Sequence, residues 1–140
     1  MEIIANALQT VQANQNVYFS DTVVSGGTAI SHRDDSGLIT LRGNTGQCRA
    51  RFRVTFGGNI AVPATGGTVG PISLAIAIEG EGIAASTMTV TPAAVSEFFK
   101  VHSSIFVDVP RGCCMSISVK NISTVPVDVE NANLIVERVA

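Results

Sequence analysis

The most constraining feature of this sequence is a ten-residue segment, QCRARFRVTF, at residues 47–56. Apolar or small side chains alternate with polar ones along its whole length. Such a period of two is typical of a strand that buries one face and exposes the other. The buried face is predicted to hold Cys48, Ala50, Phe52, Val54 and Phe56, and the opposite face to hold Arg49, Arg51, Arg53 and Thr55.

This row of arginines is unusual because the chain has few charged residues. Charged residues make up 14% of the sequence, hydrophobic residues 46%, and the mean hydropathy is +0.37. Such a composition indicates either a large core or apolar surface that other subunits cover, since monomers rarely expose large apolar patches. The arginines therefore need partners, within the chain or on another copy.

The charge balance and the length of the apolar runs exclude several classes of protein. The net charge is −2 and the chain has two lysines, Lys100 and Lys120, which argues against nucleic-acid binding through many phosphate contacts. No run reaches the roughly 18 apolar residues of a membrane span. The first residues lack the features of a signal peptide, so we expect a cytoplasmic protein or one released by lysis.

Turn residues divide the 140-residue chain into about ten short segments, which we interpret as the strands of a single all-β sandwich domain. Residues 1–12 are expected to form either a first strand, over about residues 5–12, or an arm. Residues 57–70 read as a glycine-rich loop, and residues 79–82 as a hairpin turn. Residues 71–79 read as a strand with small side chains on its outward face, and residues 93–100 could form a helical turn.

The three cysteines, Cys48, Cys113 and Cys114, form no zinc-ligand spacing. We interpret them as small buried apolar residues at strand positions. A disulfide between Cys48 and Cys114, or a redox role, remains the alternative.

No pattern of catalytic residues is visible, so we expect neither enzymatic activity, nor a cofactor, nor a metal. The two histidines, His32 and His102, have no second ligand at metal-binding spacing, and Asp34 and Asp35 beside His32 read as a solvated turn. Nucleotide-binding and nucleophile-elbow patterns are absent. The loops best suited to binding a partner contain Arg33, Asp34, Asp35 and Asn59.

Several segments together resemble the bacterial type of C1q/TNF-like jelly-roll domain. The similar features are TV…NQNV.F near residues 10–19, I.H…SG.ITL.G near residues 30–43, the glycine-led strand that starts at Gly46, and the closing strand at residues 132–139. This type includes the C-terminal domains of collagen-like spore-surface proteins and similar domains in phage and prophage proteins. The sequence departs from the family at Cys48 or its neighbour, where a tyrosine is usual, and the 140 residues contain no Gly-X-Y tract.

The resemblance implies a two-sheet jelly roll of about ten antiparallel strands that assembles as a homotrimer. It places the arginine strand beside the closing strand, on which Leu134 and Val136 would point inward. Glu137 would then pair with Arg51 or Arg53, within one subunit or across to a neighbour. The implied trimer interface consists of Arg49, Arg51, Arg53, Asn133, Ile135 and Glu137.

The function favoured by this resemblance is that of a structural protein of a phage or prophage virion, such as a capsid decoration or head-fibre trimer. Its partners would be other copies of itself and a capsid or other virion protein. The alternative is a trimeric module that binds a surface glycan or receptor through its loops. An enzyme of the cupin type would require a histidine cluster, which the sequence lacks.

Overall fold

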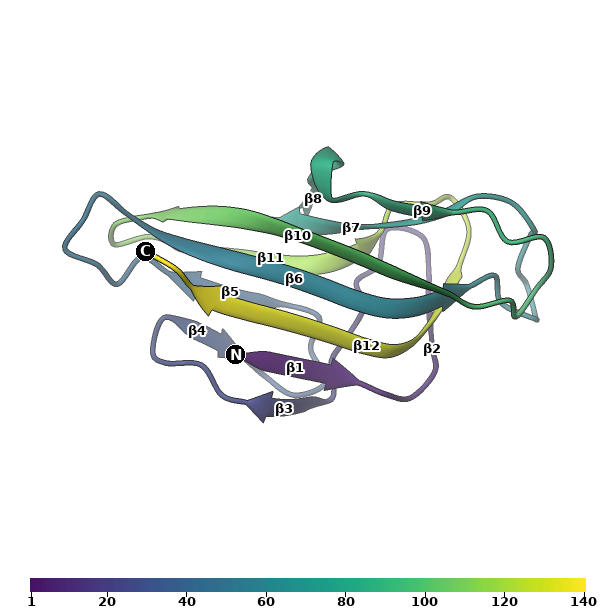
Figure 1. The fold of residues 1–140 in the computed structure, drawn as a ribbon, viewed down its shortest axis with the longest axis horizontal. Helices are drawn as coiled ribbons and strands as arrows, with labels where there is room; N and C mark the ends of the chain where they lie inside the picture. Colours follow the sequence, from purple (N-terminus) through teal and green to yellow (C-terminus); the bar gives the residue numbers. More distant parts are fainter.

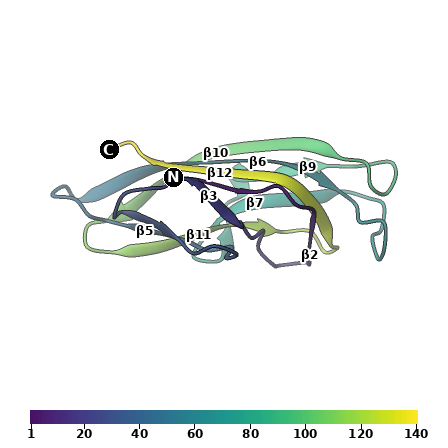
Figure 2. The same cartoon turned by 90° about the horizontal axis from the view of Figure 1, so that it is seen from below.

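The alternating segments of the chain form two antiparallel sheets that pack face to face (Figures 1 and 2). The computed structural model describes residues 1–140. The long sheet has the order β10-β6-β12-β1-β3, with β2 also paired to β12, and the short sheet has the order β4-β5-β11-β7-β8, with β9 paired to β7. This arrangement confirms the all-β, two-sheet jelly roll predicted from the sequence.

The strands differ greatly in length. The long sheet contains β1 (Glu2–Ala5), β2 (Gln9–Val11), β3 (Asp21–Val24), β6 (Arg49–Ala61), β10 (Phe99–Pro110) and β12 (Val127–Arg138). The short sheet contains β4 (Ile30–His32), β5 (Ile39–Arg42), β7 (Ile72–Ile78), β8 (Glu81–Gly82), β9 (Met88–Val90) and β11 (Cys114–Asn121). A single 3-10 turn, η1 (Ala84–Ser86), is the one helical element, and no helix could span a membrane.

The arginine segment forms β6, the longest strand, which lies between β10 and β12 in the long sheet. Its predicted inward residues Ala50, Phe52, Val54 and Phe56 are completely buried, in a core of 28 residues between the sheets. The ring of Phe56 meets that of Phe19 edge-on, with 6.5 Å between the centroids. The alternation therefore sets which face of the sheet forms the core, as the sequence predicted.

The closing strand β12 lies between β6 and β1, next to the arginine strand. Its residues Leu134 and Val136 are buried, whereas Ile135 and Glu137 are exposed on the opposite face. Both the strand adjacency and the facing of the side chains agree with the sequence-based expectation.

Three boundaries differ from those expected. Residues 57–61 continue β6 rather than opening a loop, because Gly57 and Gly58 fit between neighbouring strands, where the side chains of Lys100 and Phe56 lie over them. The expected first strand over residues 5–12 is split into β1 and β2, and β1 lies within the sheet rather than in an arm. Residues 93–96 form bends and turns without a helix, and residues 99–100 already belong to β10.

The strand β7 and its hairpin follow the sequence closely. Glu79 and Gly80 both have positive φ, 53° and 83°, as the two central residues of a tight hairpin turn require. The outward face of β7 is covered by another part of the same chain. Ala75 on this face is only 1% exposed, because Gly82 packs so closely that a Cβ there would lie 3.7 Å from the Cβ of Ala75.

The prediction that the cysteines are buried is wrong. All three are free and exposed. Cys48 lies in the loop before β6 begins, Cys113 lies in the turn between β10 and β11, and Cys114 is the first residue of β11. The inward alternation therefore begins at Ala50, because the sandwich has no core beyond that residue at this end.

The β5–β6 loop and the β10–β11 turn meet at Gly43, and this contact predicts a position-specific cost of substitution. A Cβ at Gly43 would lie 2.1 Å from the carbonyl oxygen of Pro110, so the backbone would have to move. We expect Gly43→Ala to lower the free energy of unfolding by about 1–3 kcal/mol, the typical cost of overpacking.

Gly46 in the same loop is the matched control, because no atom lies within 4 Å of a Cβ there. Urea unfolding monitored by circular dichroism compares Gly43→Ala with Gly46→Ala. Equal midpoints for the two variants would contradict the predicted clash.

Candidate functional site

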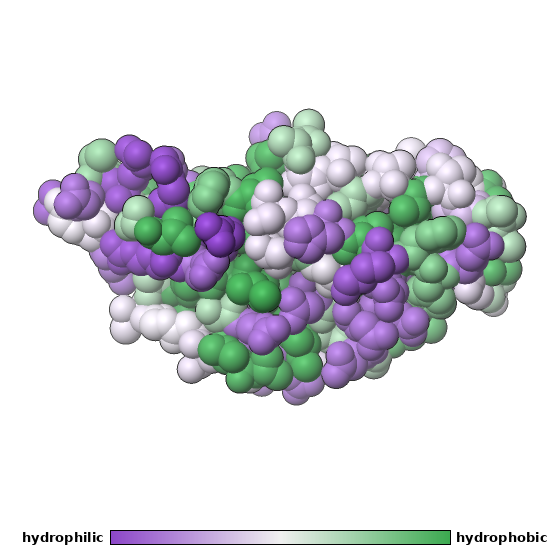
Figure 3. Space-filling view, viewed as in Figure 1, coloured by the Kyte–Doolittle hydropathy of each residue, from purple (hydrophilic) through white to green (hydrophobic).

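The outer face of the long sheet is the main candidate site, because no other part of the chain covers it. Figure 3 views the molecule from this side and shows apolar and polar patches mixed across the face. The arginine strand β6 lies between the edge strand β10 and the closing strand β12 on this face. Arg49 and Arg53 are exposed and Arg51 is partly exposed, all on the face opposite to the core.

Asp108 on β10 is the partner of two of the arginines. Its carboxylate accepts hydrogen bonds from Arg51 Nε at 2.8 Å and Arg51 Nη2 at 3.1 Å, a bidentate arrangement. Arg49 Nε lies 3.2 Å from its second oxygen. One carboxylate thus serves two guanidinium groups, and one positive charge is left over.

These contacts shift the ionisation of both partners. The hydrogen bonds from Arg51 hold the pKa of Asp108 below its ordinary value, and the positive charges of Arg51 and Arg49 act in the same direction. The same hydrogen bonding raises the pKa of the Arg51 guanidinium. Because the group is exposed to solvent, its contribution to stability is small.

Arg53 pairs with the closing strand instead. Its Nη1 donates to Glu137 Oε1 at 3.2 Å, and the two residues are direct cross-strand neighbours. The sequence analysis left two ion-pair partners open for Glu137, namely Arg51 and Arg53. It also left open whether the pair forms within one subunit or between subunits. The structure forms the pair with Arg53 inside one chain, while Arg51 bonds to Asp108.

Phe106 on β10 is the most exposed large apolar residue of the chain, at 59%. The guanidinium carbons of Arg53 and Arg51 lie 5.5 and 5.9 Å from the centre of its ring, within cation–π distance. Ile135 on β12 is a second exposed apolar residue of this face. Exposed aromatic and arginine side chains of this kind are enriched in protein interfaces.

The remaining predicted residue of the face, Asn133, donates a hydrogen bond from Nδ2 to the carboxylate of Glu2 on β1. All six residues of the predicted interface therefore lie on one face, spread over β6 and β12. Asp108 and Phe106 were missed. Their strand was recognised, but no local signal in the sequence placed it beside β6.

The predicted binding loops do not come together. Arg33, Asp34 and Asp35 lie between β4 and β5, where Asp35 has a positive φ of 65° and its backbone N–H donates to the Phe19 carbonyl. Asn59 is not a loop residue: it lies within β6, opposite Lys100 and Glu130, because the strand continues through the glycines.

Beside the β4–β5 loop is a shallow open pocket of about 360 Å³. His32 Nε2 hydrogen-bonds to the Ser36 carbonyl at 2.8 Å, which fixes the ring at the edge of this pocket. The pocket is lined by Ser31, His32, Arg33, Ser36, Leu38 and Thr40. No group of three or more histidine, cysteine or acidic side chains is arranged to hold a metal ion.

No family model and no curated protein sequence matches the chain. Among solved structures, it is similar to the globular domain of zebrafish complement 1qA protein, with a TM-score of 0.63, 11% identity, and coverage of 96% of this chain and 93% of that chain. This likeness confirms the C1q/TNF-like jelly-roll fold expected from the sequence.

Two further structures are similar at lower scores. The C-terminal domain of EclA, a sugar-binding protein, has a TM-score of 0.43 at 14% identity, over 95% of this chain and 79% of that chain. A family 35 carbohydrate-binding module from Clostridium thermocellum has a TM-score of 0.36 at 12% identity, over 91% and 97% of the two chains. At these scores the likeness carries no argument about function.

The pairing of Asp108 predicts a measurable change in its titration. In Arg51→Ala, the pKa of Asp108 should rise toward the ordinary carboxyl value, because its main hydrogen-bond donor is removed. Carboxyl-carbon NMR across the acid range measures the shift. In the unchanged protein, the stabilisation from this pair is present above the ordinary carboxyl pKa and disappears as the pH falls through the lowered value.

Arg49→Ala is the matched control. Arg49 acts on Asp108 chiefly through its charge, which is the weakest of the contributions. Its removal should move the Asp108 titration less than the removal of Arg51. A larger effect from Arg49→Ala would show that the bidentate contact is not the main cause of the lowered pKa.

Proposed function

We propose that this chain is a non-enzymatic structural protein that forms a homotrimer through the outer face of its long sheet. The observation that carries the proposal is the exposed ring of Phe106, which lies beside the guanidinium groups of Arg51 and Arg53 on this face. Monomeric proteins rarely leave such a surface open, and its residue types are those enriched in interfaces.

The size of the face follows from the lengths and the spacing of its strands. The 13-residue strand β6 is about 40 Å long, and the five strands of the sheet path span about 20 Å. The face therefore offers up to roughly 800 Å² per subunit, which in a cyclic trimer is divided between two neighbours. The C1q-like fold is compatible with oligomeric assembly of this kind.

The setting proposed for the trimer is a phage or prophage virion, where it would act as a capsid decoration or head fibre. This part rests on the resemblance of the sequence to jelly-roll domains of phage and prophage proteins. The partner would be a capsid or other virion protein, and the protein would reside in the host cytoplasm before release by lysis. Neither nucleic acid nor membrane is needed as a partner.

Assembly is tested by the mass in solution. Light scattering after size exclusion, at micromolar concentration, should give three times the 14.5 kDa of the chain. We expect Phe106→Ala to raise the concentration at which the trimer dissociates by at least about tenfold, because an exposed aromatic residue flanked by arginines is a typical interface hot spot.

Leu38→Ala is the matched control, since Leu38 is comparably exposed, at 51%, but adjoins the short sheet. It should leave the mass unchanged. A monomeric wild-type protein, or equal effects of the two substitutions, would contradict the proposed interface.

A second candidate function, recognition of a surface glycan or receptor, is favoured by the polar pocket beside the β4–β5 loop. Hydroxyl groups, a histidine and Arg33 line it, and such groups can hydrogen-bond to sugar hydroxyls or acids. We expect Arg33→Ala to abolish any binding detected on a glycan array. Arg111→Ala, an exposed arginine in the β10–β11 turn, is the control. Binding that survives Arg33→Ala would exclude this pocket.

A further inference from the structure

The outer face of the long sheet is divided into two halves of opposite charge. The basic half comprises the outward residues of β10 and β6, and the acidic half those of β12, β1 and β3. Charged side chains of the basic half are Arg49, Arg51, Arg53, Lys100 and Asp108, and the solvent-accessible ones of the acidic half are Glu2, Asp21, Glu130 and Glu137. Asp128 also lies on this side of β12, but it is buried and its carboxylate accepts a hydrogen bond from Thr10. Four cationic groups and one carboxylate therefore face four accessible carboxylates across the line between β6 and β12.

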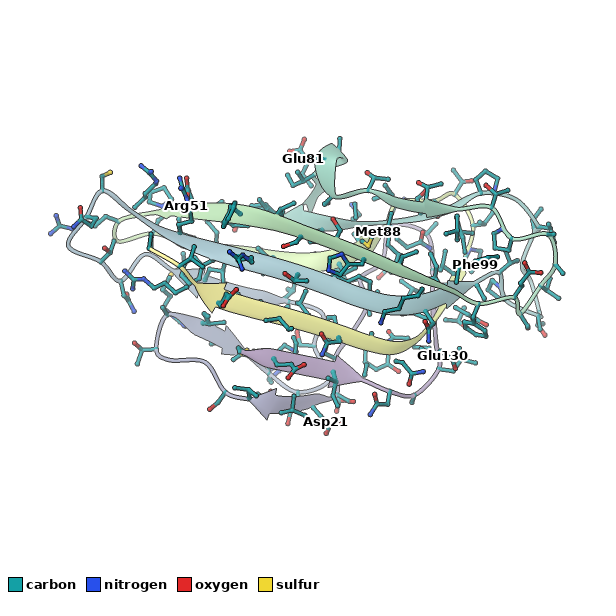
Figure 4. All side chains as sticks on the ribbon, in the orientation of Figure 1. Asp21, Arg51, Glu81, Met88, Phe99 and Glu130 are labelled. Carbon is teal, nitrogen blue, oxygen red and sulfur yellow. The ribbon has the colours of Figure 1, made fainter.

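The division follows from the register of the sheet. Lys100, Asn59 and Glu130 form one row across β10, β6 and β12, and Asn133, Ile4 and Asp21 form part of the next row across β12, β1 and β3. Figure 4 shows Arg51 and Asp21 toward opposite edges of the face. Arg138, at the end of β12, is not counted with the outward residues, because it pairs with the inward-facing Phe52 and its Nη1 donates to the Asn44 carbonyl in the β5–β6 loop.

Contacts within the chain neutralise only part of this charge. Arg53 and Glu137 compensate each other across the boundary, and Asp108 compensates one of its two arginines. Lys100 in the basic half has no ion-pair partner. Asp21, Glu130 and Glu2 in the acidic half have none either, and Glu2 only accepts a hydrogen bond from the neutral amide of Asn133. Unpaired positive charge thus lies in the half formed by β10 and β6. Unpaired negative charge lies in the half formed by β12, β1 and β3.

The apolar groups are divided in a matching way. Phe106 is exposed in the basic half, between Arg51 and Arg53. In the acidic half, Ile135 is 38% exposed and Val24 on the edge strand β3 is 55% exposed. Each half thus carries apolar surface that a partner of opposite charge could cover.

We propose that the basic half of one copy docks on the acidic half of the next copy, so that the ring closes through head-to-tail contacts. This inference rests on the proposed trimer and names the two surfaces that meet in it. A cyclic trimer requires such heterologous contacts, in which different patches of the two subunits touch. Contact between like halves would bring unpaired charges of the same sign together, which is strongly disfavoured at an interface.

The test uses two surface reversals that leave the Arg51–Asp108 and Arg53–Glu137 pairs intact. The basic-half reversal is Arg49→Glu with Lys100→Glu, and the acidic-half reversal is Asp21→Lys with Glu130→Lys. Each should raise the concentration at which the trimer dissociates at least tenfold, measured by light scattering. A chain carrying all four substitutions should recover trimer formation to within about threefold of the wild type, because its halves are again complementary.

Native mass spectrometry of an equimolar mixture of the two reversed chains gives a second readout. With the Arg53–Glu137 pair set aside, because its charges cancel across the boundary, one chain then has net negative charge in both halves and the other net positive charge in both. Mixed complexes should therefore form where neither chain associates alone. Circular dichroism and urea unfolding establish that each variant is folded.

The outcomes separate this inference from the proposed function. A wild-type trimer that tolerates either reversal, or a four-substitution chain that stays dissociated, overturns the head-to-tail arrangement and leaves the trimer standing. A monomeric wild-type protein overturns both. The wild-type trimer should also weaken as salt is raised from 50 to 500 mM, because salt screens contacts between exposed charges.

Discussion

The structure depends on the strict alternation of inward and outward side chains along β6. This strand pairs with β10 on one side and with β12 on the other. Its inward residues Phe52, Val54 and Phe56 are fully buried, so a shift of register by one residue would place arginines in the core. Burying unpaired charge is far more costly than any gain that a shifted register could offer. The core and the charged outer face are therefore two results of the same pattern, and neither can change without the other.

The contacts on the outer face follow from that register. Asp108 lies directly opposite Arg51, and Glu137 directly opposite Arg53, so both ion pairs are cross-strand neighbours rather than chance meetings of long side chains. Phe106 is opposite Arg53 and two residues before Asp108 on the same face of β10, which places its ring beside two guanidinium groups. The surface that we propose as the interface is thus held in place by the sheet beneath it.

The sequence was sufficient to predict the elements with a clear local pattern, namely the arginine strand, the Glu79–Gly80 turn and the inward side of β12. It also predicted that Glu137 would pair with an arginine of β6. It did not predict Asp108, because the adjacency of β10 and β6 is a long-range pairing with no local signal. Gly57 suggested a loop, although in the sheet its missing side chain leaves room for Lys100. The cysteines were wrongly predicted to be buried. For Cys48, the inward alternation of β6 was extended beyond the end of the core, which begins at Ala50.

The position of β12 between β6 and β1 has a consequence for how the chain folds. Until β12 is available, β1 can pair only with β3 and β6 only with β10, so the long sheet exists as two separate pieces. The strand that joins them is the last one in the sequence. Such distant pairings make folding slow, since a long loop must close before the contacts form. A nascent chain is therefore expected to expose the apolar sides of both pieces, and to need protection from aggregation, until its final strand inserts.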